Sequence, residues 1–390
     1  MWLVPALRFP EFTREWKEHY LAEYLDFKNG LNPSANKFGS GIKFISVMDI
    51  LNNDFITYDC IRTSVEITPE EQVAFVVEKG DMLFQRSSET LEDVGRANVY
   101  MDNRPAVFGG FVIRGKKKAE YNPMFFRYLL ASPYARKKII PMGAGAQHFN
   151  IGQDGLSKVK LHFPILQEQQ KIAALLRLID ERIATQNKII EDLKKLKSAL
   201  ADKLYSSTKG ETYSFRQLFD VVNERNKKLT YSNVLSASQE LGMIERSDIN
   251  IDIKFEQDSI SKYKIVRRGD YVVHLRSFQG GFAFSDRTGI CSPAYTILRP
   301  HDMVVYGYLS YFFMSKPFIK SLKLVTYGIR DGRSINVEEW LDMTVTLPTR
   351  QKQSHIITII NAIDDKLNNE NQIHTCLLQQ RAFLLKVMFI

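Results

Sequence analysis

An internal repeat constrains the fold of this chain more than any other feature. Pro164–Ile172 recurs as Pro348–Ile356, at a shift of 184 residues. Further pairs share this shift: Ile151 with Ile335, Leu176 with Ile360, Ile179 with Ile363, Asp180 with Asp364, Ile183 with Leu367 and Leu193 with Leu377. Solenoid repeats have units of about 20 to 50 residues, so this repeat indicates two copies of a whole domain-plus-helix module.

The order of the repeated parts predicts the domain organisation. Lys79-Gly80-Asp81 resembles Arg268-Gly269-Asp270 at a shift of 189, so loop lengths differ between the copies. A chain of 390 residues also exceeds one ordinary core. We expect a first domain over 1–163, a long helix over 164–207, a second domain over 208–347 and a second long helix over 348–390.

Each copy ends in a stretch with a long amphipathic pattern. Apolar residues follow a 4-3 alternation in both stretches, at Ile172, Leu176, Ile179, Ile183, Ile190, Leu193, Leu200 and Leu204, and at Ile356, Ile360, Ile363, Leu367, Leu377, Leu384 and Met388. Gln186 and Lys197 interrupt the first stripe, and Glu370 and Arg381 interrupt the second at equivalent positions. The period does not show whether the apolar stripe of each helix packs against the other helix or against another chain. Their places after two similar domains favour an antiparallel coiled coil with pseudo-twofold symmetry, its register fixed by the polar interruptions.

The remaining segments predict two domains of mixed α/β structure, which makes the fold class α+β. Short β-type runs are broken by Gly, Asn and Pro, at Ile42–Val47, Ala74–Val77, Asp81–Phe84 and Ala106–Ile113, and at Tyr263–Val266, Asp270–Leu275 and Ala294–Leu298. Aromatic helices are expected at Met124–Ala131 and Tyr308–Ser315.

Composition narrows the function classes only slightly. Fifty-three Lys and Arg against forty-four Asp and Glu leave a net charge of +9, which suits a polyanionic partner but also many other proteins. The three cysteines are far apart, which fits reduced thiols, and no segment reaches the ~18 apolar residues of a membrane span. We expect a cytoplasmic protein with no membrane partner.

Taken together, the order of these elements resembles type I restriction-modification specificity subunits along essentially the whole chain. The phrases that carry the resemblance are Leu7–Phe12, Lys79–Asp81, Pro164–Ile172 and Leu377–Gln380, in shared order. The resemblance implies a DNA-binding adaptor whose two target-recognition domains each read half of a split site in double-stranded DNA. Two methyltransferase subunits would dock on the helices and bind S-adenosylmethionine, and motor-nuclease subunits would bring ATP and Mg²⁺. A modification-only system would use the same adaptor.

The expected helix length bounds the spacing of the two half-sites. Thirty-eight helical residues span about 57 Å, or roughly 17 base pairs, at about 1.5 Å per residue. Because the domains overhang the helix ends, the unread gap should be shorter, from a fraction of a turn up to about one turn. The unlike loops of the two copies predict an asymmetric, non-palindromic target.

Base reading requires side chains with paired donors and acceptors on loops that reach a groove. Two groups of loops qualify. The first follows the Lys-Gly-Asp strands and contains Gln85, Arg86, Ser87 and Arg96, with His274, Arg276, Ser277 and Gln279 in the second copy. The second lies in Gly-containing loops before the spacer helices and contains Gln147, His148 and Asn150, with Arg330 and Arg333 in the second copy. Solvated strand ends and structural turns are the competing interpretations.

No catalytic chemistry is predicted for this chain. Asn122-Pro123 resembles part of an amino-methyltransferase motif but lacks its second proline, and a proline-started helix explains it better. No phosphate-binding loop of the ATPase type and no Cys/His ligand spacing occurs, so we expect no cofactor and no metal. The rival hypotheses are a DNA adenine methyltransferase with a drifted cofactor motif and a coiled-coil scaffold unrelated to DNA.

Overall fold

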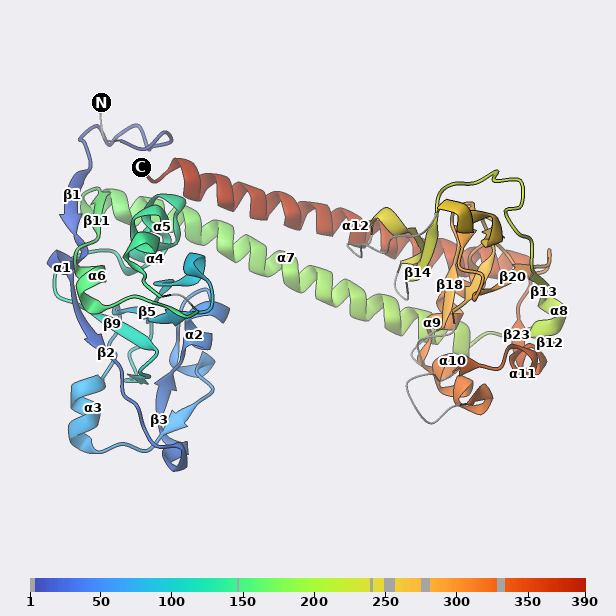
Figure 1. Ribbon diagram of the computed structural model, residues 1–390, viewed down its shortest axis with the longest axis horizontal. Coiled ribbons are helices and arrows are strands. Elements are labelled where there is room, and N and C mark those ends of the chain that lie inside the picture. The colour runs from blue at the N-terminus through green and yellow to red at the C-terminus, as the bar shows by residue number, and fades with distance from the viewer. Residues whose placement is uncertain (1–3, 146, 239–240, 249–256, 275–280, 328–333) are drawn as a thin grey trace. The chain divides into compact units, whose positions relative to one another are not determined.

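The computed structural model describes residues 4–145, 147–238, 241–248, 257–274, 281–327 and 334–390. The chain divides into two compact units (Figure 1): unit 1 contains Met1–Asn187 and Gln372–Ile390, and unit 2 contains Lys188–Asn371. Each unit therefore holds part of both long helices, α7 (Leu166–Ser206) and α12 (Arg350–Val387). Among the described residues, no helix combines the length and apolar character that a membrane span requires.

Unit 1 is built on a four-stranded antiparallel sheet. Its order is β2 (Leu25–Asn29), β9 (Val112–Lys117), β5 (Met82–Gln85) and β7 (Ala97–Val99). Alternate strand residues point to opposite faces, so Met82 and Phe84 of β5 enter one core while Leu83 enters another. The central strand is therefore buried on both faces.

The other strands of unit 1 frame this sheet. They are β1 (Lys17–Tyr20) paired with β11 (Lys160–Phe163), β6 (Ser87–Ser88) paired with β10 (Phe149–Asn150), and a small sheet of β4 (Ser64–Val65), β3 (Phe38–Ile45) and β8 (Val107–Phe108). The helices before α7 are α1 (Leu21–Tyr24), α2 (Val47–Asn52), α3 (Pro69–Phe75), α4 (Pro123–Ala131), α5 (Pro133–Ile139) and α6 (Gln153–Ser157).

Unit 2 repeats the frame of unit 1. Its antiparallel sheet has the order β13 (Phe219–Val222), β20 (Thr296–Pro300), β17 (Tyr271–Val273) and β18 (Phe282–Phe284). Tyr271 and Val273 enter the larger core and Val272 the smaller one, as in β5. The equivalent pair of β1 and β11 is β12 (Glu211–Ser214) with β23 (Thr344–Leu347).

The rest of unit 2 differs from unit 1 in its attachments. Two antiparallel strand pairs stand in place of the small sheet, β14 (Leu235–Ser238) with β15 (Gly242–Glu245) and β16 (Lys264–Val266) with β19 (Gly289–Cys291). The remaining elements are α8 (Phe215–Leu218), α9 (Tyr308–Met314), α10 (Lys316–Ser321), α11 (Val337–Asp342) and the pair β21 (Thr326–Tyr327) with β22 (Ser334–Ile335).

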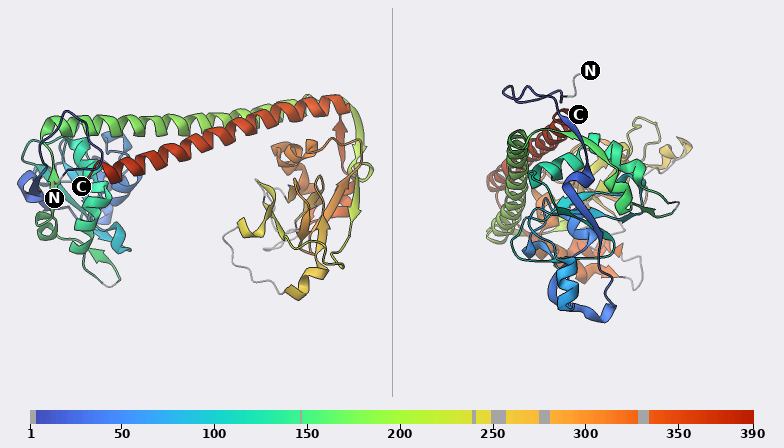
Figure 2. Two further views of the ribbon diagram at one scale, coloured as in Figure 1. Left: turned by 90° about the horizontal axis from the view of Figure 1, so that it is seen from above. Right: turned by 90° about the vertical axis from the view of Figure 1, so that its left-hand side faces the viewer.

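In each unit the two long helices pack against each other and against the domain. The core of unit 1 takes Ile172, Leu176 and Ile179 from the first half of α7 and Leu384, Leu385, Met388 and Phe389 from the end of the chain. In unit 1 the end of α12 lies beside the start of α7 (Figure 2). The core of unit 2 takes Ile356 and Ile360 from the first half of α12, packed with Leu204 and Tyr205 from the end of α7. The start of one helix thus lies beside the end of the other, as in an antiparallel pair. Within each unit, the seam holds helices of the same chain.

The repeated phrase at Pro164 and Pro348 ties each long helix to its domain. Gln169 is buried; its Oε1 accepts from the N–H of Asn122 at 3.0 Å and its Nε2 donates to the carbonyl of Pro164 at 2.9 Å. Gln353 in the same way accepts from the N–H of Val305 at 2.8 Å and donates to the carbonyls of Met303 and Pro348. Each glutamine satisfies backbone groups at the start of an aromatic helix, which explains why the repeat retains it.

The repeated Gly-Asp pair has a structural explanation as well. Gly80 and Gly269 have φ of 96° and 98°, a region that glycine adopts without strain. The Asp81 carboxylate accepts from the N–H groups of Glu78 and Lys117, each at 3.0 Å, and closes the turn before β5. Asp270 accepts from the N–H of Arg267 at 2.8 Å and from the Arg299 guanidinium.

Most predicted elements are found, but two strand predictions need correction. Ala74 and Phe75 belong to helix α3, because Thr68 caps Glu71 and Pro69 occupies the first turn, so a strand over Ala74–Val77 is wrong. The run Ala106–Ile113 is broken by a turn between β8 and β9. Both aromatic helices are confirmed, and α4 begins at Pro123 with Asn122 as its cap, accepting from the N–H of Phe125 at 2.9 Å.

Candidate nucleic-acid interface

The structure brings together two loops of unit 1 that the sequence predicts to read DNA. Strand β6 pairs with β10, which sets Ser87 opposite Asn150, and the Ser87 hydroxyl donates to Asn150 Oδ1. The Ile151 N–H donates to the Arg86 carbonyl at 2.9 Å. We call Arg86, Ser87, His148 and Asn150 the unit 1 surface. His148 and Asn150 are exposed, whereas Arg86 and Ser87 are half-buried.

Gln85 lies beneath this surface instead of on it. Its side chain is 5% exposed, and its Nε2 donates to the Ser87 carbonyl at 2.9 Å. Its Oε1 is buried without a hydrogen-bond partner among the described residues. Because it cannot reach a base without moving, Gln85 fits a role in shaping the β5–β6 bend better than the predicted role in reading.

Arg86 directs its donors to a neighbouring turn of the chain. Its N–H donates to the Phe111 carbonyl at 2.9 Å, and its Nη1 donates to the Gly110 carbonyl at 3.2 Å. The guanidinium therefore holds the turn between β8 and β9. Gln147 is exposed in the loop before β10, and Asn150 Nδ2 donates to the His148 carbonyl at 3.3 Å.

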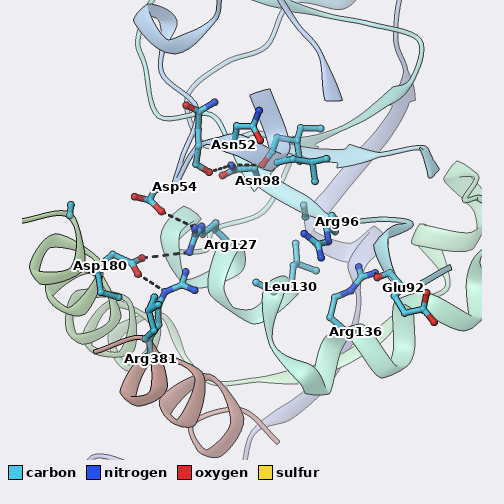
Figure 3. Close-up of a pocket in the computed structure, with 18 of the residues that line it drawn as sticks. Asn52, Asp54, Glu92, Arg96, Asn98, Arg127, Leu130, Arg136, Asp180 and Arg381 are labelled. Atoms are coloured by element: carbon cyan, nitrogen blue, oxygen red, sulfur yellow. Dashed lines mark hydrogen bonds and ion pairs between the residues drawn. The ribbon is translucent and has the colours of Figure 1, made fainter. Parts of the chain in front are cut away.

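Arg96 lies beside these residues and lines a cavity of about 680 Å³ in unit 1 (Figure 3). The Gln85 N–H donates to the Arg96 carbonyl at 2.7 Å, which fixes Arg96 next to the β5–β6 bend. The Arg96 side chain is 55% exposed and pairs with Asp93 at 2.6 Å. Arg96 is thus accessible from solvent, as a DNA-contacting side chain must be.

The two sides of this cavity differ in charge balance. On one side Arg127 lies between Asp54 and Asp180, at 3.7 and 3.6 Å, and Arg381 binds Asp180 (Figure 3). On the far side of Leu130, Arg136 donates to the carbonyls of Glu92 and Val94, and burial, together with the charge of Arg96, lowers its pKa to about 10. The Arg96 side can accept an anionic group such as a DNA phosphate.

In unit 2, His274 is the one residue predicted to read DNA that lies among the described residues. His274 is half-buried at the end of β17, where its N–H donates to the Gly281 carbonyl at 2.8 Å and burial lowers the pKa of its imidazole. The other predicted residues of this copy, Arg276, Ser277, Gln279, Arg330 and Arg333, lie outside the described residues. Their roles stay predictions.

A cluster that sequence reasoning did not single out recurs in both units. In unit 1, Asp180 of α7 accepts from the Tyr128 hydroxyl at 2.7 Å and from Arg381 Nε of α12 at 2.5 Å. In unit 2, Asp364 of α12 accepts from the Tyr311 hydroxyl and from Lys197 Nζ of α7 at 2.5 Å. We call these the aspartate clusters. Each joins both long helices to the aromatic helix of its domain, and the repeat register contained the signal.

The interruptions of the apolar stripes acquire a role from these clusters. Lys197 and Arg381 are the cations of the two clusters, and Asp180 and Asp364 already matched at the 184-residue shift. Burial of the two hydroxyl groups raises the pKa values of Tyr128 and Tyr311, and the hydrogen bonds to Asp180 and Asp364 raise them further. The predicted role in fixing helix register is consistent with such directional pairs.

These features define a class of protein: two recognition-type domains on one repeated frame, each held by a shared pair of long helices. Residues 13–195 match the family described as "Type I restriction modification DNA specificity domain". The putative type I restriction enzyme MjaX specificity subunit of Methanocaldococcus jannaschii is 23% identical over 385 residues, covering 91% of this chain and 88% of that protein. The MjaVIII specificity subunit of the same organism is 23% identical over 200 residues, half of this chain and 46% of that protein.

Solved structures support the same class at the level of the fold. A type I restriction-modification S subunit from M. genitalium matches with a TM-score of 0.57 at 15% identity, covering 99% of both chains. The HsdS subunit from Thermoanaerobacter tengcongensis matches with a TM-score of 0.51 at 13% identity, covering 96% of both. The resemblance to type I restriction-modification specificity subunits is confirmed, because residues 13–195 match the DNA specificity domain of that family and the MjaX specificity subunit is similar over most of this chain.

Proposed function

We propose that this chain recognises an asymmetric, bipartite site in double-stranded DNA as the specificity subunit of a type I restriction-modification complex. The observation that carries the proposal is the pairing of a repeated frame with unlike attachments. The sheet, the buried glutamine and the aspartate cluster occur twice, while the loops and small sheets beside them differ. Residues 1–163 and 208–347 would each read one half-site.

The long helices, with residues 164–207 and 348–390 as spacers, would set the distance between the half-sites. With 41 and 38 residues, α7 and α12 are about 60 Å long at about 1.5 Å per residue, which keeps the gap below roughly 17 base pairs. A spacer of fixed length distinguishes a bipartite site from two independent sites. The proposal places the protein in the cytoplasm, where chromosomal DNA is accessible.

Catalysis in this proposal belongs to partner subunits. Two methyltransferase subunits would bind S-adenosylmethionine, and motor-nuclease subunits would bind ATP and Mg²⁺. Apolar side chains that the stripe does not use offer a docking face on the unit 2 part of α7, where Ile189 and Leu196 are 38% and 48% exposed. Their spacing of 7 residues places them on one face of the helix, which suits a partner helix.

A map of methylated adenines in the genome, with and without this gene, tests the proposal. The expected result is one asymmetric motif in two halves separated by a fixed gap. Exchanging residues 208–347 for the second domain of a relative should change one half of the motif, and the reciprocal exchange of 1–163 should change the other. A perfect palindrome, or no gene-dependent methylation, would contradict the bipartite reading.

A second measurement tests the assignment of catalysis. The purified chain should neither bind S-adenosylmethionine nor transfer a methyl group to DNA, and both activities should appear when the methyltransferase subunit is added. Methyl transfer by the chain alone would favour the methyltransferase alternative. Duplex DNA shifted without sequence preference by the assembled complex would favour a scaffold instead.

A further inference from the structure

An exposed aromatic ring stands beside the unit 1 surface. The turn between β8 and β9 is closed by a hydrogen bond from the Val112 N–H to the Gly109 carbonyl at 2.8 Å, which leaves Gly110 and Phe111 at its tip. The Phe111 side chain is 68% exposed, more than any other aromatic side chain of the described residues. The sequence offered no signal for this residue, because phenylalanine is not a hydrogen-bonding base reader.

The turn that carries Phe111 is fixed from below. A Cβ on Gly110 would lie 1.9 Å from Asn32 Oδ1, and a Cβ on Gly30 would lie 2.1 Å from the Gly109 carbonyl oxygen. The N–H of Leu31 donates to the Phe108 carbonyl at 3.0 Å. At Gly30 the two backbones therefore approach so closely that only glycine fits, while at Gly110 the Asn32 side chain packs directly against the turn.

Arg86 fixes the same turn from the side. Its backbone N–H and its Nη1 donate to the carbonyls of Phe111 and Gly110. Single exposed apolar residues are common on protein surfaces and need no explanation. The backbone of Phe111 is held through Arg86, whose own carbonyl accepts from the N–H of Ile151 beside the exposed Asn150, so the exposed ring is presented in one place.

We propose that Phe111 makes an apolar contact with a base of the half-site that unit 1 reads. This inference rests on the proposed function and adds a specificity-determining residue to it. Arg86 is then a positioning residue that holds the turn. In DNA, the apolar partners of a phenylalanine ring are the thymine methyl group and the faces of an opened base step, and both contacts require the ring itself.

The contact belongs to one half-site only. Phe84 pairs with Ile113 in unit 1, and the equivalent Val273 pairs with Thr296 in unit 2. This register aligns Phe111 with Ala294, which is exposed but has no ring. Loss of Phe111 should therefore alter recognition of one half of the target and leave the other half unchanged.

The test uses the full chain assembled with its methyltransferase subunit. Phe111→Ala should weaken binding to the intact site about tenfold, the size of one lost base contact. It should also remove the base preference at one position of one half-site. Val73→Ala is the matched control, because Val73 is 79% exposed in the same unit, and it should leave binding unchanged. Circular dichroism of each variant checks that the fold is retained.

Two modified duplexes identify the kind of contact. If the ring touches a thymine methyl group, replacing that thymine by uracil should weaken wild-type binding and leave Phe111→Ala unaffected. If the ring enters a base step, 2-aminopurine at that step should brighten on binding of the wild type and stay dim with the variant. Either outcome supports the inference.

The inference and the proposed function fail in different ways. Unchanged affinity and base preference in Phe111→Ala would overturn the inference while the bipartite site stands. An equal loss of affinity for every DNA sequence would also overturn it, because the ring would then not read a base. Absence of sequence-selective binding by the wild-type complex would instead refute the proposed function.

Discussion

The two units share a frame and differ in what is attached to it. Both have a sheet whose central strand is buried on both faces, a glutamine that satisfies the start of the aromatic helix, and an aspartate cluster on the long helices. Around this frame, unit 1 carries the sheet β4–β3–β8 and unit 2 carries two strand pairs. The comparison teaches that the repeated parts hold a domain on the helices, while the unlike parts carry the differences between the units, which under the proposed function would contact different DNA.

One position of the shared frame differs between the two units, and substitutions there should give the largest difference in stability. Glu168 is 1% exposed and binds Arg8 through two hydrogen bonds of 2.7 Å, and it also accepts from the indole N–H of Trp16. Its equivalent, Lys352, is exposed. Glu168→Ala should destabilise unit 1 by about 3 kcal/mol, because it leaves a nearly buried guanidinium without its partner.

Hydrogen exchange resolved by peptide measures this effect in each unit separately. Protection should fall in residues 8–16 and at the start of α7, with unit 2 unaffected. Lys352→Ala is the control and should change neither unit. Equal effects of the two substitutions would show that Glu168 gives unit 1 no anchor of its own.

The buried glutamines should behave alike in both units. Gln169→Leu leaves the Asn122 N–H without its acceptor, and Gln353→Leu leaves the Val305 N–H without its acceptor. Each substitution should cost about 2 kcal/mol, because an unpaired buried donor pays its full desolvation. Native-state hydrogen exchange resolved by peptide would report the stability of unit 1 and of unit 2 separately. A loss confined to one unit would contradict the shared frame.

The aspartate clusters should show a smaller and unequal effect. Arg381→Met and Lys197→Met each remove the cation that joins the helices, at about 1 kcal/mol for a partly exposed pair. Unit 1 should lose less stability than unit 2, because Arg127 remains 3.6 Å from Asp180 after Arg381 is replaced. Burial and the charge of Arg381 both lower the pKa of Arg127, and the substitution removes the second of these effects. Thermal unfolding of both variants checks the order, and a larger loss in Arg381→Met would reverse it.

Two histidines should make the stability of the two units depend on pH in opposite directions. This is the smallest of the expected effects. A hydrogen bond to Asp220 raises the pKa of His301, so its stabilisation of unit 2 is full below pH 6.5 and is lost as pH rises through the folded pKa. Burial, and secondarily Lys138, lowers the pKa of His162, so unit 1 loses stability as pH falls below 6.5. NMR titration should place the two pKa values on opposite sides of 6.5, and Asp220→Asn should lower only that of His301.

Much of the frame could be predicted because it depends on period and repetition. The 4-3 stripe placed both long helices within a few residues of their ends, and every stripe residue is buried or half-buried. Ala74–Val77 failed because an apolar run of four residues fits either strand or helix. The helix start at Thr68 and Pro69, six and five residues before Ala74, decided for helix.

The site was less predictable because it depends on geometry across loops. Polar type suggested Gln85 and Arg86 as readers, yet burial turns Gln85 inward and backbone carbonyls of the next turn engage Arg86. Phe111 was not predicted, because the role proposed for it depends on the close backbone approach at Gly30 and on the hydrogen bonds from Arg86, which one sequence does not reveal. The pairing of Asp180 and Asp364 could have been predicted, since a carboxylate that recurs at the same position next to two apolar stripes requires a partner.

The origin of the unit 1 core has a consequence for biosynthesis. Leu384, Met388 and Phe389 pack against Trp16 and Leu176, more than 200 residues earlier in the chain, and the Val387 carbonyl accepts from the N–H of Leu7. Because synthesis proceeds from the N-terminus, the first half of the protein leaves the ribosome before the segment that covers it exists. Until then an apolar face of unit 1 stays open to water, so the first unit translated is the last to close.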